Sequence, residues 1–306
     1  MHKLLILTNL KEYDEYRHHI ETANLPGLEI ADAPSQDVDI VFGDPTRIKQ
    51  KLNQLPGLKW AQSTWAGIEP LLDPSLRRNY ILTNARGVFG GLMSEFVFGY
   101  LLLYERKILQ RIEIQKQACW DKTASGTLRG KTIGLLGVGS IGMHLAGTAR
   151  HFNMHVRGFT RSSETCDQVD RYYHGSELPE FATNLDYLVC VLPNTNETQH
   201  IVNADFLASL PSHAVLINIG RGNTVDEPAL IAALKAKKLA GAVLDVFEQE
   251  PLPATHPLWQ TKNVFITCHS AGPSFPMDIS ELFAENYRRI SDGKPLKFQV
   301  DFERGY

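Results

Sequence analysis

The sequence predicts an α/β fold in which parallel strands alternate with helices. Short apolar runs of strand length recur along the chain, and helical patterns of apolar and charged residues separate many of them. Proline and glycine interrupt the chain between the runs, as they do at turns. The 306 residues leave room for two domains, and the 43% hydrophobic content is enough to form their cores and excludes a disordered chain.

The first part of the chain predicts one α/β unit. A helix is expected over residues 12–22, where apolar side chains recur at helical spacing. The strand candidates are residues 3–8, 38–43, 58–62 and 80–83. A long proline-free stretch follows at residues 91–117, and we expect one long helix there that carries the chain into the second domain.

A second alternating series begins at Lys131 and predicts a doubly wound dinucleotide-binding fold. Its strand candidates are residues 132–136, 155–159, 187–192, 214–219, 241–245 and 264–267. Helices are expected between most of these strands, at residues 141–152, 204–210 and 228–238. Near the end of the chain we expect a helix at residues 278–290 and a last strand at 297–300.

Charge and cysteine content exclude several classes of function. The formal net charge of -3 does not support a broad nucleic-acid surface. The four cysteines include no C-x-x-C pair, so neither a zinc knuckle nor a redox pair is expected, and no metal site is predicted. The N-terminal apolar run is too short for a secretory signal, and the longest apolar run, at 96–104, is too short for a membrane span. We therefore expect a cytoplasmic protein without nucleic-acid or membrane partners.

A glycine-rich turn marks a candidate nucleotide site. Gly137, Gly139 and Gly142 form a G-x-G-x-x-G pattern between an apolar strand candidate and a helix candidate, which is the context that the motif requires. The first glycine permits the tight turn, the second lets the backbone approach a pyrophosphate, and the third lets helix and strand pack closely. Ser140 and Ile141, at the start of the helix, are expected to present their amides to the phosphates. The alternative is an ordinary strand-to-helix turn.

The end of the next strand candidate indicates which dinucleotide is bound. NAD sites usually place an acidic residue about 20 residues after the glycines, where it bonds the ribose 2′-OH. Here the chain has Thr160, Arg161 and Ser162, with no carboxylate before Glu164. A guanidinium and hydroxyl groups suit a 2′-phosphate, so we predict NADP as the cofactor, with NAD as the weaker candidate. The alternative is that Arg161 is a solvated loop charge.

Three residues suit hydride chemistry on a carboxylated carbonyl. Arg221, Glu250 and His269 each follow a strand candidate of the second series, and ligands of open α/β sheets bind beyond those carboxyl ends. The arginine would orient an anionic substrate, the histidine would give a proton to the carbonyl oxygen, and the glutamate would hold the histidine ring. Singly, such residues are more often structural, but their order and the glycine turn together favour catalysis.

These motifs resemble the D-isomer-specific 2-hydroxyacid dehydrogenase family, and within it the glyoxylate/hydroxypyruvate reductase branch. The resemblance covers most of the chain. It implies a Rossmann cofactor domain at residues 100–274, inserted in a flavodoxin-like substrate domain formed by residues 1–99 and 275–306. It also implies a homodimer, in which the helix before Trp120 leads into a dimer-forming arm.

The resemblance assigns roles to the matching positions. Arg221, Glu250 and His269 would be catalytic, and Asp245 would bind the cofactor's carboxamide. The other cofactor contacts that it implies are Leu192, Pro193, Thr198, Ile219, Gly220 and Gly272. The substrate would meet Arg221 and His269, together with Trp65, Ala66 and Gly67. The family usually has proline before the histidine, whereas this chain has Cys268, so we expect His269 to be held less rigidly.

The sequence thus predicts an enzyme that reduces a small 2-keto acid to the D-2-hydroxy acid with NADPH. We expect the substrate to lie between the two domains, where closure would exclude water. One alternative is a dinucleotide-sensing binding protein, similar to corepressors related to this family. Another is a phosphite-type dehydrogenase of the same superfamily. The formate type is disfavoured because it has glutamine in the position of Glu250.

Overall fold

The computed structural model describes residues 1–305 and divides the chain into two compact units. The first unit consists of residues 1–88 and the chain from Ser274 onwards, and the second is Phe89–Pro273. The expected boundary at residues 99/100 needs correction. Residue 99 lies inside the helix α3 (Gly90–Glu105), whose buried apolar side chains Val97, Phe98 and Leu101 belong to the core of the second unit, so the division falls before that helix.

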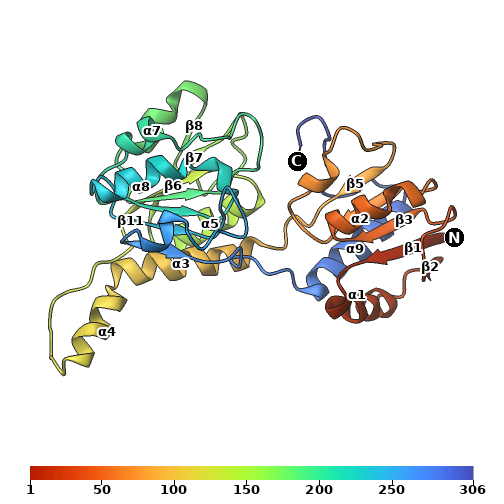
Figure 1. Ribbon diagram of the computed structural model, residues 1–306, viewed down its shortest axis with the longest axis horizontal. Helices are drawn as coiled ribbons and strands as arrows, with labels where there is room; N and C mark the ends of the chain where they lie inside the picture. The colour runs from red at the N-terminus through yellow and green to blue at the C-terminus, as the bar shows by residue number, and fades with distance from the viewer. Residues whose placement is uncertain (306) are drawn as a thin grey trace. The chain divides into compact units, whose positions relative to one another are not determined.

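The first unit is built on a parallel sheet in the order β2-β1-β3-β4-β5 (Figure 1). Its strands are β1 (His2–Leu7), β2 (Leu28–Ala31), β3 (Ile40–Gly43), β4 (Trp60–Ser63) and β5 (Ile81–Thr83). Its helices are α1 (Leu10–Thr22), α2 (Pro45–Lys51) and α9 (Pro276–Ser291), with 3₁₀ turns η1 (Leu52–Gln54) and η2 (Glu69–Leu71). This strand order is that of flavodoxin-like folds, as predicted.

Both ends of the chain build the core of the first unit. The ring of Phe283, from α9, stacks on the indole of Trp60 in β4 with centroids 5.0 Å apart. Both side chains are buried, and helix α9 lies beside α1. The C-terminal helix therefore completes a unit that begins with residue 1, which is why this domain is discontinuous in sequence.

The second unit has a seven-stranded parallel sheet in the order β12-β11-β10-β9-β6-β7-β8. Its strands are β6 (Thr132–Leu136), β7 (His155–Phe159), β8 (Arg171–Tyr173), β9 (Tyr187–Cys190), β10 (Val215–Asn218), β11 (Gly241–Leu244) and β12 (Val264–Ile266). Its helices are α3, α4 (Ile108–Lys116), α5 (Ser140–His151), α6 (Leu178–Ala182), α7 (Ala204–Ser209) and α8 (Glu227–Lys235), with 3₁₀ turns η3 (Gly175–Glu177), η4 (Gly222–Thr224) and η5 (Pro257–Gln260). The order reverses between β6 and β9, as in a doubly wound dinucleotide-binding fold.

Alternate residues of each central strand enter different cores. In β9, Leu188 and Cys190 pack with the side chains of α6, α7 and α8 on one face of the sheet. Tyr187 and Val189 pack on the other face with the side chains of α3 and α5. Because successive side chains of a strand point to opposite faces, a sheet covered on both sides needs continuously apolar strands. This explains the uninterrupted apolar runs in the sequence.

The expected long helix at residues 91–117 is wrong as one element. Helix α3 ends at Glu105, and α4 begins at Ile108 after a left-handed Lys107 (φ 51°). Left-handed backbone at a helix end is usually provided by glycine, so a lysine there is not visible as a stop signal. The expected strand at 297–300 is also wrong, since Gln299 makes an isolated antiparallel bridge with Thr83.

The prediction missed four short elements, namely β2, β8, α2 and α6. They span three to seven residues each, which is too short for periodicity to separate strand, helix and loop. None of the helices described within residues 1–305 is long and apolar enough to cross a membrane.

Candidate functional site

The glycine turn after β6 has the geometry that its pattern predicts. Gly137 has φ +109°, which L side chains rarely adopt. A Cβ on Gly142 would lie 2.4 Å from the carbonyl oxygen of Gly137, so only glycine lets the helix pack this closely on the turn. A Cβ on Gly139 would meet nothing within 4 Å. The approach to the backbone at Gly139 is therefore open, as binding of a pyrophosphate would require.

Helix α5 begins directly after this turn, with Gly139 as its N-cap. Within the described residues 1–305, no side chain caps the first turn, so its amides have no side-chain acceptor there. The positive end of the helix dipole adds to these donors. The uncapped helix start and the open Gly139 backbone fit the phosphates of a dinucleotide, with Ser140 and Ile141 nearest the turn.

The loop after β7 holds the residues predicted to select the cofactor. The Thr160 hydroxyl donates to the Ser163 carbonyl (2.9 Å), and the backbone carbonyl of Thr160 lies 2.9 Å from His174 Nδ1. His174 Nε2 lies 2.7 Å from Glu164 Oε1. The bond to Glu164, with that to Thr160, raises the pKa of His174. Glu164, the first carboxylate after the strand, therefore contacts a histidine that belongs to none of the predicted motifs.

Arg161 in the same loop pairs with a residue from a different strand end. Its Nη2 lies 2.6 Å from Glu197 Oε2, and both side chains are more than half exposed. Glu197 belongs to the loop after β9, for which cofactor contacts are predicted. In that loop the Thr198 hydroxyl donates to the Pro193 carbonyl (2.7 Å). The predicted contacts around residues 160 and 198 therefore come from loops that touch each other.

The loops after β9 and β10 also approach closely. A Cβ on Gly220 would lie 2.9 Å from the Leu192 carbonyl oxygen, so glycine is required for this contact. Ile219, the residue before it, is buried. The predicted positions at 192 and 220 therefore lie against each other beyond β9 and β10. Gly272 lies elsewhere in the unit, against the side chain of Met93 in α3.

Glu250 and His269 form a hydrogen-bonded pair. His269 Nδ1 lies 2.8 Å from Glu250 Oε2, and the other carboxylate oxygen accepts the amide of Phe247 (3.0 Å). The histidine side chain is 57% exposed, so Nε2 is the ring nitrogen left to meet a ligand. A carboxylate on Nδ1 sets the ring orientation and stabilises the imidazolium. This is the arrangement that an acid–base histidine needs.

Asp245 anchors the loop that carries this histidine. It is 1% exposed, and its carboxylate accepts the amides of Ser270 (2.8 Å) and Ala271 (3.0 Å) and the hydroxyl of Thr267 (2.5 Å). Its carbonyl accepts the amide of His269 (2.8 Å). Three successive amides of the loop, at residues 269 to 271, therefore bond to Asp245. We expected His269 to be held less rigidly because Cys268 stands where the family usually has proline, and the structure gives no support for this. The role predicted for Asp245 toward a carboxamide stays a prediction.

Arg221 lies at the neighbouring strand end. It follows β10, which pairs with β11, and β11 pairs with β12, so the segments that hold Arg221, Glu250 and His269 leave adjacent strands at the same edge. The Asn218 side-chain amide donates to the Arg221 carbonyl (2.9 Å), and the guanidinium donates to the Gly220 carbonyl (2.9 Å). The backbone of Arg221 is therefore fixed beside β10.

The predicted substrate loop lies in the first unit. The carbonyl of Trp65 accepts the Ala85 amide (3.1 Å), and the carbonyl of Ala66 accepts the Asn84 side chain (2.8 Å). In a trans peptide the next amide points opposite to the carbonyl, so the N–H groups of Ala66 and Gly67 point away from residues 84 and 85. Two neighbouring backbone donors of this kind suit a carboxylate. The Trp65 side chain is 45% exposed.

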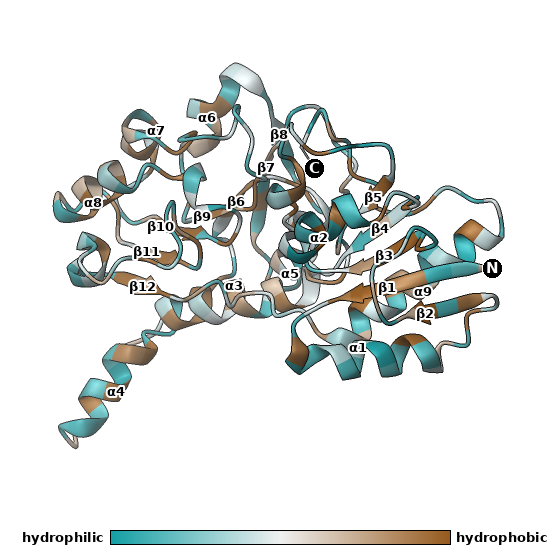
Figure 2. Ribbon diagram, turned by 45° about the vertical axis from the view of Figure 1, so that its right-hand side comes forward, coloured by the Kyte–Doolittle hydropathy of each residue, from teal (hydrophilic) through white to brown (hydrophobic). Residues whose placement is uncertain are grey.

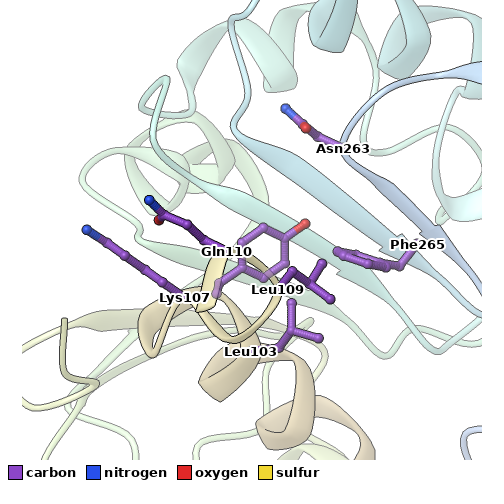
Figure 3. A pocket seen from close by; sticks show the side chains of 7 residues that line it. Leu103, Lys107, Leu109, Gln110, Asn263 and Phe265 are labelled. Carbon is purple, nitrogen blue, oxygen red and sulfur yellow. The ribbon is translucent and has the colours of Figure 1, made fainter. Parts of the chain in front are cut away.

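The second unit also has a hollow outside this site. It measures about 220 Å³ and is lined by apolar and polar side chains where α3 meets α4, with Leu109 and Phe265 on its wall (Figure 3). It contains none of the residues predicted to bind cofactor or substrate. Residues 1–305 also hold no cluster of three or more side chains suited to a metal ion.

Comparisons with known proteins agree with this geometry. Residues 98–271 match the NAD binding domain of the D-isomer specific 2-hydroxyacid dehydrogenases. A glyoxylate/hydroxypyruvate reductase A of Klebsiella pneumoniae is 35% identical over 217 residues, which are 71% of this chain and 70% of that protein. A D-isomer specific 2-hydroxyacid dehydrogenase family protein from Aeromonas salmonicida superposes with a TM-score of 0.90 at 42% identity, over 98% of this chain and 99% of that one. Another such dehydrogenase, from Xanthobacter autotrophicus Py2 in complex with NADPH and MES, superposes with a TM-score of 0.90 at 31% identity, over 100% and 99% of the two chains.

Proposed function

The chain belongs to the D-isomer-specific 2-hydroxyacid dehydrogenase family, and on that premise we propose that it reduces a small 2-keto acid of the glyoxylate or hydroxypyruvate type, with NADPH, to the D-2-hydroxy acid. The observation that carries the proposal is the 2.8 Å contact between His269 Nδ1 and Glu250 Oε2, at a sheet edge that also holds Arg221. NADPH supplies the hydride. The chain's own residues supply binding, orientation and the proton.

The proposed chemistry follows from the atoms that each residue offers. The Arg221 guanidinium carries planar donors that match a carboxylate and an adjacent carbonyl oxygen. His269, charged and supported by Glu250, gives the proton on Nε2 to the carbonyl oxygen as negative charge develops there. The neutral ring takes that proton back in the reverse oxidation. The amides of Ala66 and Gly67 are proposed as further donors to the substrate carboxylate.

We propose that the turn of Gly137, Gly139 and Gly142 and the start of α5 hold the pyrophosphate, with the loops at residues 192–198 and 219–220 along the dinucleotide. Thr160, Arg161 and Ser162 are proposed to meet a 2′-phosphate. Support comes from the basic and hydroxyl character of that loop, and from the engagement of its first carboxylate, Glu164, with His174. The NADPH complex of the Xanthobacter relative agrees with this choice.

A panel of 2-keto acids tested with NADPH and with NADH checks the proposal. We expect turnover with glyoxylate and hydroxypyruvate and a higher kcat/KM with NADPH. Oxidation of phosphite without turnover of any keto acid would favour the phosphite-type alternative. Tight dinucleotide binding without turnover of either class would favour the corepressor-like alternative.

We also propose a cytoplasmic homodimer. All nine residues of α4 are at least partly exposed, and Ile108, Leu109 and Ile112 are each more than 40% exposed. Figure 2 shows apolar and polar residues interleaved along this helix. Exposed aliphatic residues on one short helix are typical of a surface that another chain covers. The four cysteines are free thiols, which suits a reducing compartment.

Sedimentation of the wild-type protein and of a variant with aspartate at positions 108, 109 and 112 tests the dimer. We expect the wild type to sediment as a dimer and the variant as a monomer. A monomeric wild-type protein would contradict the proposal.

A further inference from the structure

We propose that Glu227 is a positioning residue for the acid–base pair, because it fixes the segment Phe247–Glu250 from which Glu250 reaches His269. The inference rests on the proposed function, since it assigns Glu227 a part in holding the proton donor. The sequence did not single out Glu227, which lies at the start of α8 and 23 positions before Glu250.

Glu227 is a buried acid whose carboxylate is not used by its own helix. The residue is 6% exposed, and Asp226 already caps α8 by accepting the amide of Ala229 (2.9 Å). Oε1 of Glu227 instead accepts the amide of Glu248 (3.0 Å), in the segment after β11. Burial of a carboxylate costs free energy unless hydrogen-bond donors contact it, so the buried position of Glu227 indicates a role beyond helix capping.

His256 meets the second oxygen of the same carboxylate. Its Nε2 lies 3.2 Å from Glu227 Oε2, and its Nδ1 accepts the amide of Leu258 (3.3 Å). A ring that accepts at Nδ1 carries a proton on Nε2, which is the ring nitrogen nearest Glu227. The buried carboxylate therefore accepts the Glu248 amide at one oxygen and has the His256 ring beside the other.

The peptide held by Glu227 also touches the arginine segment. A Cβ on Gly222, the residue after Arg221, would lie 1.8 Å from the carbonyl carbon of Phe247 and 2.4 Å from the nitrogen of Glu248. The Phe247–Glu248 peptide is therefore pressed against the backbone at residue 222 on one side and bonded to Glu227 through its amide.

The same segment leads directly to the acid–base pair. The amide of Phe247 donates to Glu250 Oε1, while Glu250 Oε2 faces His269. Two successive peptide units, 246–247 and 247–248, thus link the Glu250 carboxylate to the buried Glu227 and to the backbone after Arg221. Without the Glu227 carboxylate, the Glu248 amide would lose its hydrogen-bond acceptor. Glu250 would then no longer be held at hydrogen-bond distance from the His269 ring.

Substitution of Glu227 by alanine and by glutamine tests the role. We expect E227A to lower kcat about 10- to 100-fold, with the dissociation constant for NADPH within about twofold of wild type, as for other supporting contacts. The E227Q variant retains an acceptor for the Glu248 amide and should recover most of the activity.

Glu105 provides a matched control. Its side chain is 14% exposed in the same unit, and it is bonded to the Tyr187 hydroxyl (2.6 Å) rather than to any segment of the site. We expect E105A to lower the melting temperature while leaving kcat unchanged. If E227A loses no more activity than E105A, the inference is overturned.

A second readout separates this inference from the proposed function. Ring nitrogen NMR shifts of His269 report which nitrogen carries the proton, and they need no substrate. We expect one tautomer in the neutral wild-type ring, with the proton on Nδ1, and a mixture in E227A. Should E227A fail to fold, H256A is expected to produce the same mixture to a smaller extent. An unchanged tautomer in the variant that folds would refute the role of Glu227, even if no keto acid is ever turned over.

Discussion

Substitution of Gly222 by alanine tests the coupling between the arginine and glutamate segments. The added Cβ would lie 1.8 Å from the carbonyl carbon of Phe247 and 1.9 Å from its oxygen, whereas ordinary contacts begin at 3.4 Å. Both partners are backbone atoms, so a backbone segment must move by more than about 1 Å to relieve the clash. Displacements of this size at a reacting group cost about 10²-fold in rate. Overpacking of a buried site also costs about 1–3 kcal/mol of stability.

We therefore expect G222A to lower kcat about 100-fold in steady-state assays with glyoxylate. The dissociation constant of NADPH, measured by fluorescence titration, should change little, because the glycine turn after β6 is untouched. Gly99 in α3 is the control, since a Cβ there meets nothing within 4 Å. G99A should raise stability by about 0.5–1 kcal/mol and leave kcat unchanged. Wild-type kcat in a folded G222A variant would refute the reasoning.

Three further changes test other parts of the site. H269A should remove most turnover because no group remains to donate the proton, while NADPH binding, measured by titration, stays within about twofold; an unchanged kcat would contradict the assignment. T160D should lower the ratio of kcat/KM with NADPH to that with NADH by about tenfold or more, because a carboxylate repels a 2′-phosphate; a constant ratio would contradict the 2′-phosphate site. H174Q should lower the melting temperature more at pH 6 than at pH 9. The pKa of His174 is raised above its ordinary 6.5 by Glu164, so its stabilising charge is present at low pH and is lost as pH rises; equal losses at both pH values would refute this.

The parts of the site that depend on local sequence could be predicted. In the turn from Gly137 to Gly142, the first and last glycines occupy positions that no other residue type fits, so the motif is visible without the fold. The order of Arg221, Glu250 and His269 is visible because each follows a continuous apolar run. Two-sided burial of the sheet makes those runs conspicuous.

The supporting contacts could not be predicted, because they join segments far apart in sequence. Glu227 and the Glu248 amide meet only when α8 packs beside the loop after β11, and a carboxylate that accepts a backbone amide leaves no pattern in the sequence. The Asp245 carboxylate likewise accepts the amides of Ser270 and Ala271, which lie far from it in sequence, so no local pattern shows these bonds. The break at Lys107 was missed because lysine seldom adopts left-handed backbone.

The backbone of His269 itself is left-handed, with φ +52°. Among non-glycine residues, asparagine tolerates this conformation best, since its short polar side chain bonds locally. An inactive variant made for trapping ternary complexes is therefore better built as H269N than with a β-branched residue. The H269N variant would not donate the proton, but its backbone would keep the left-handed conformation at residue 269. Crystals of this variant with keto acid and dinucleotide bound would therefore show a nearly undistorted loop.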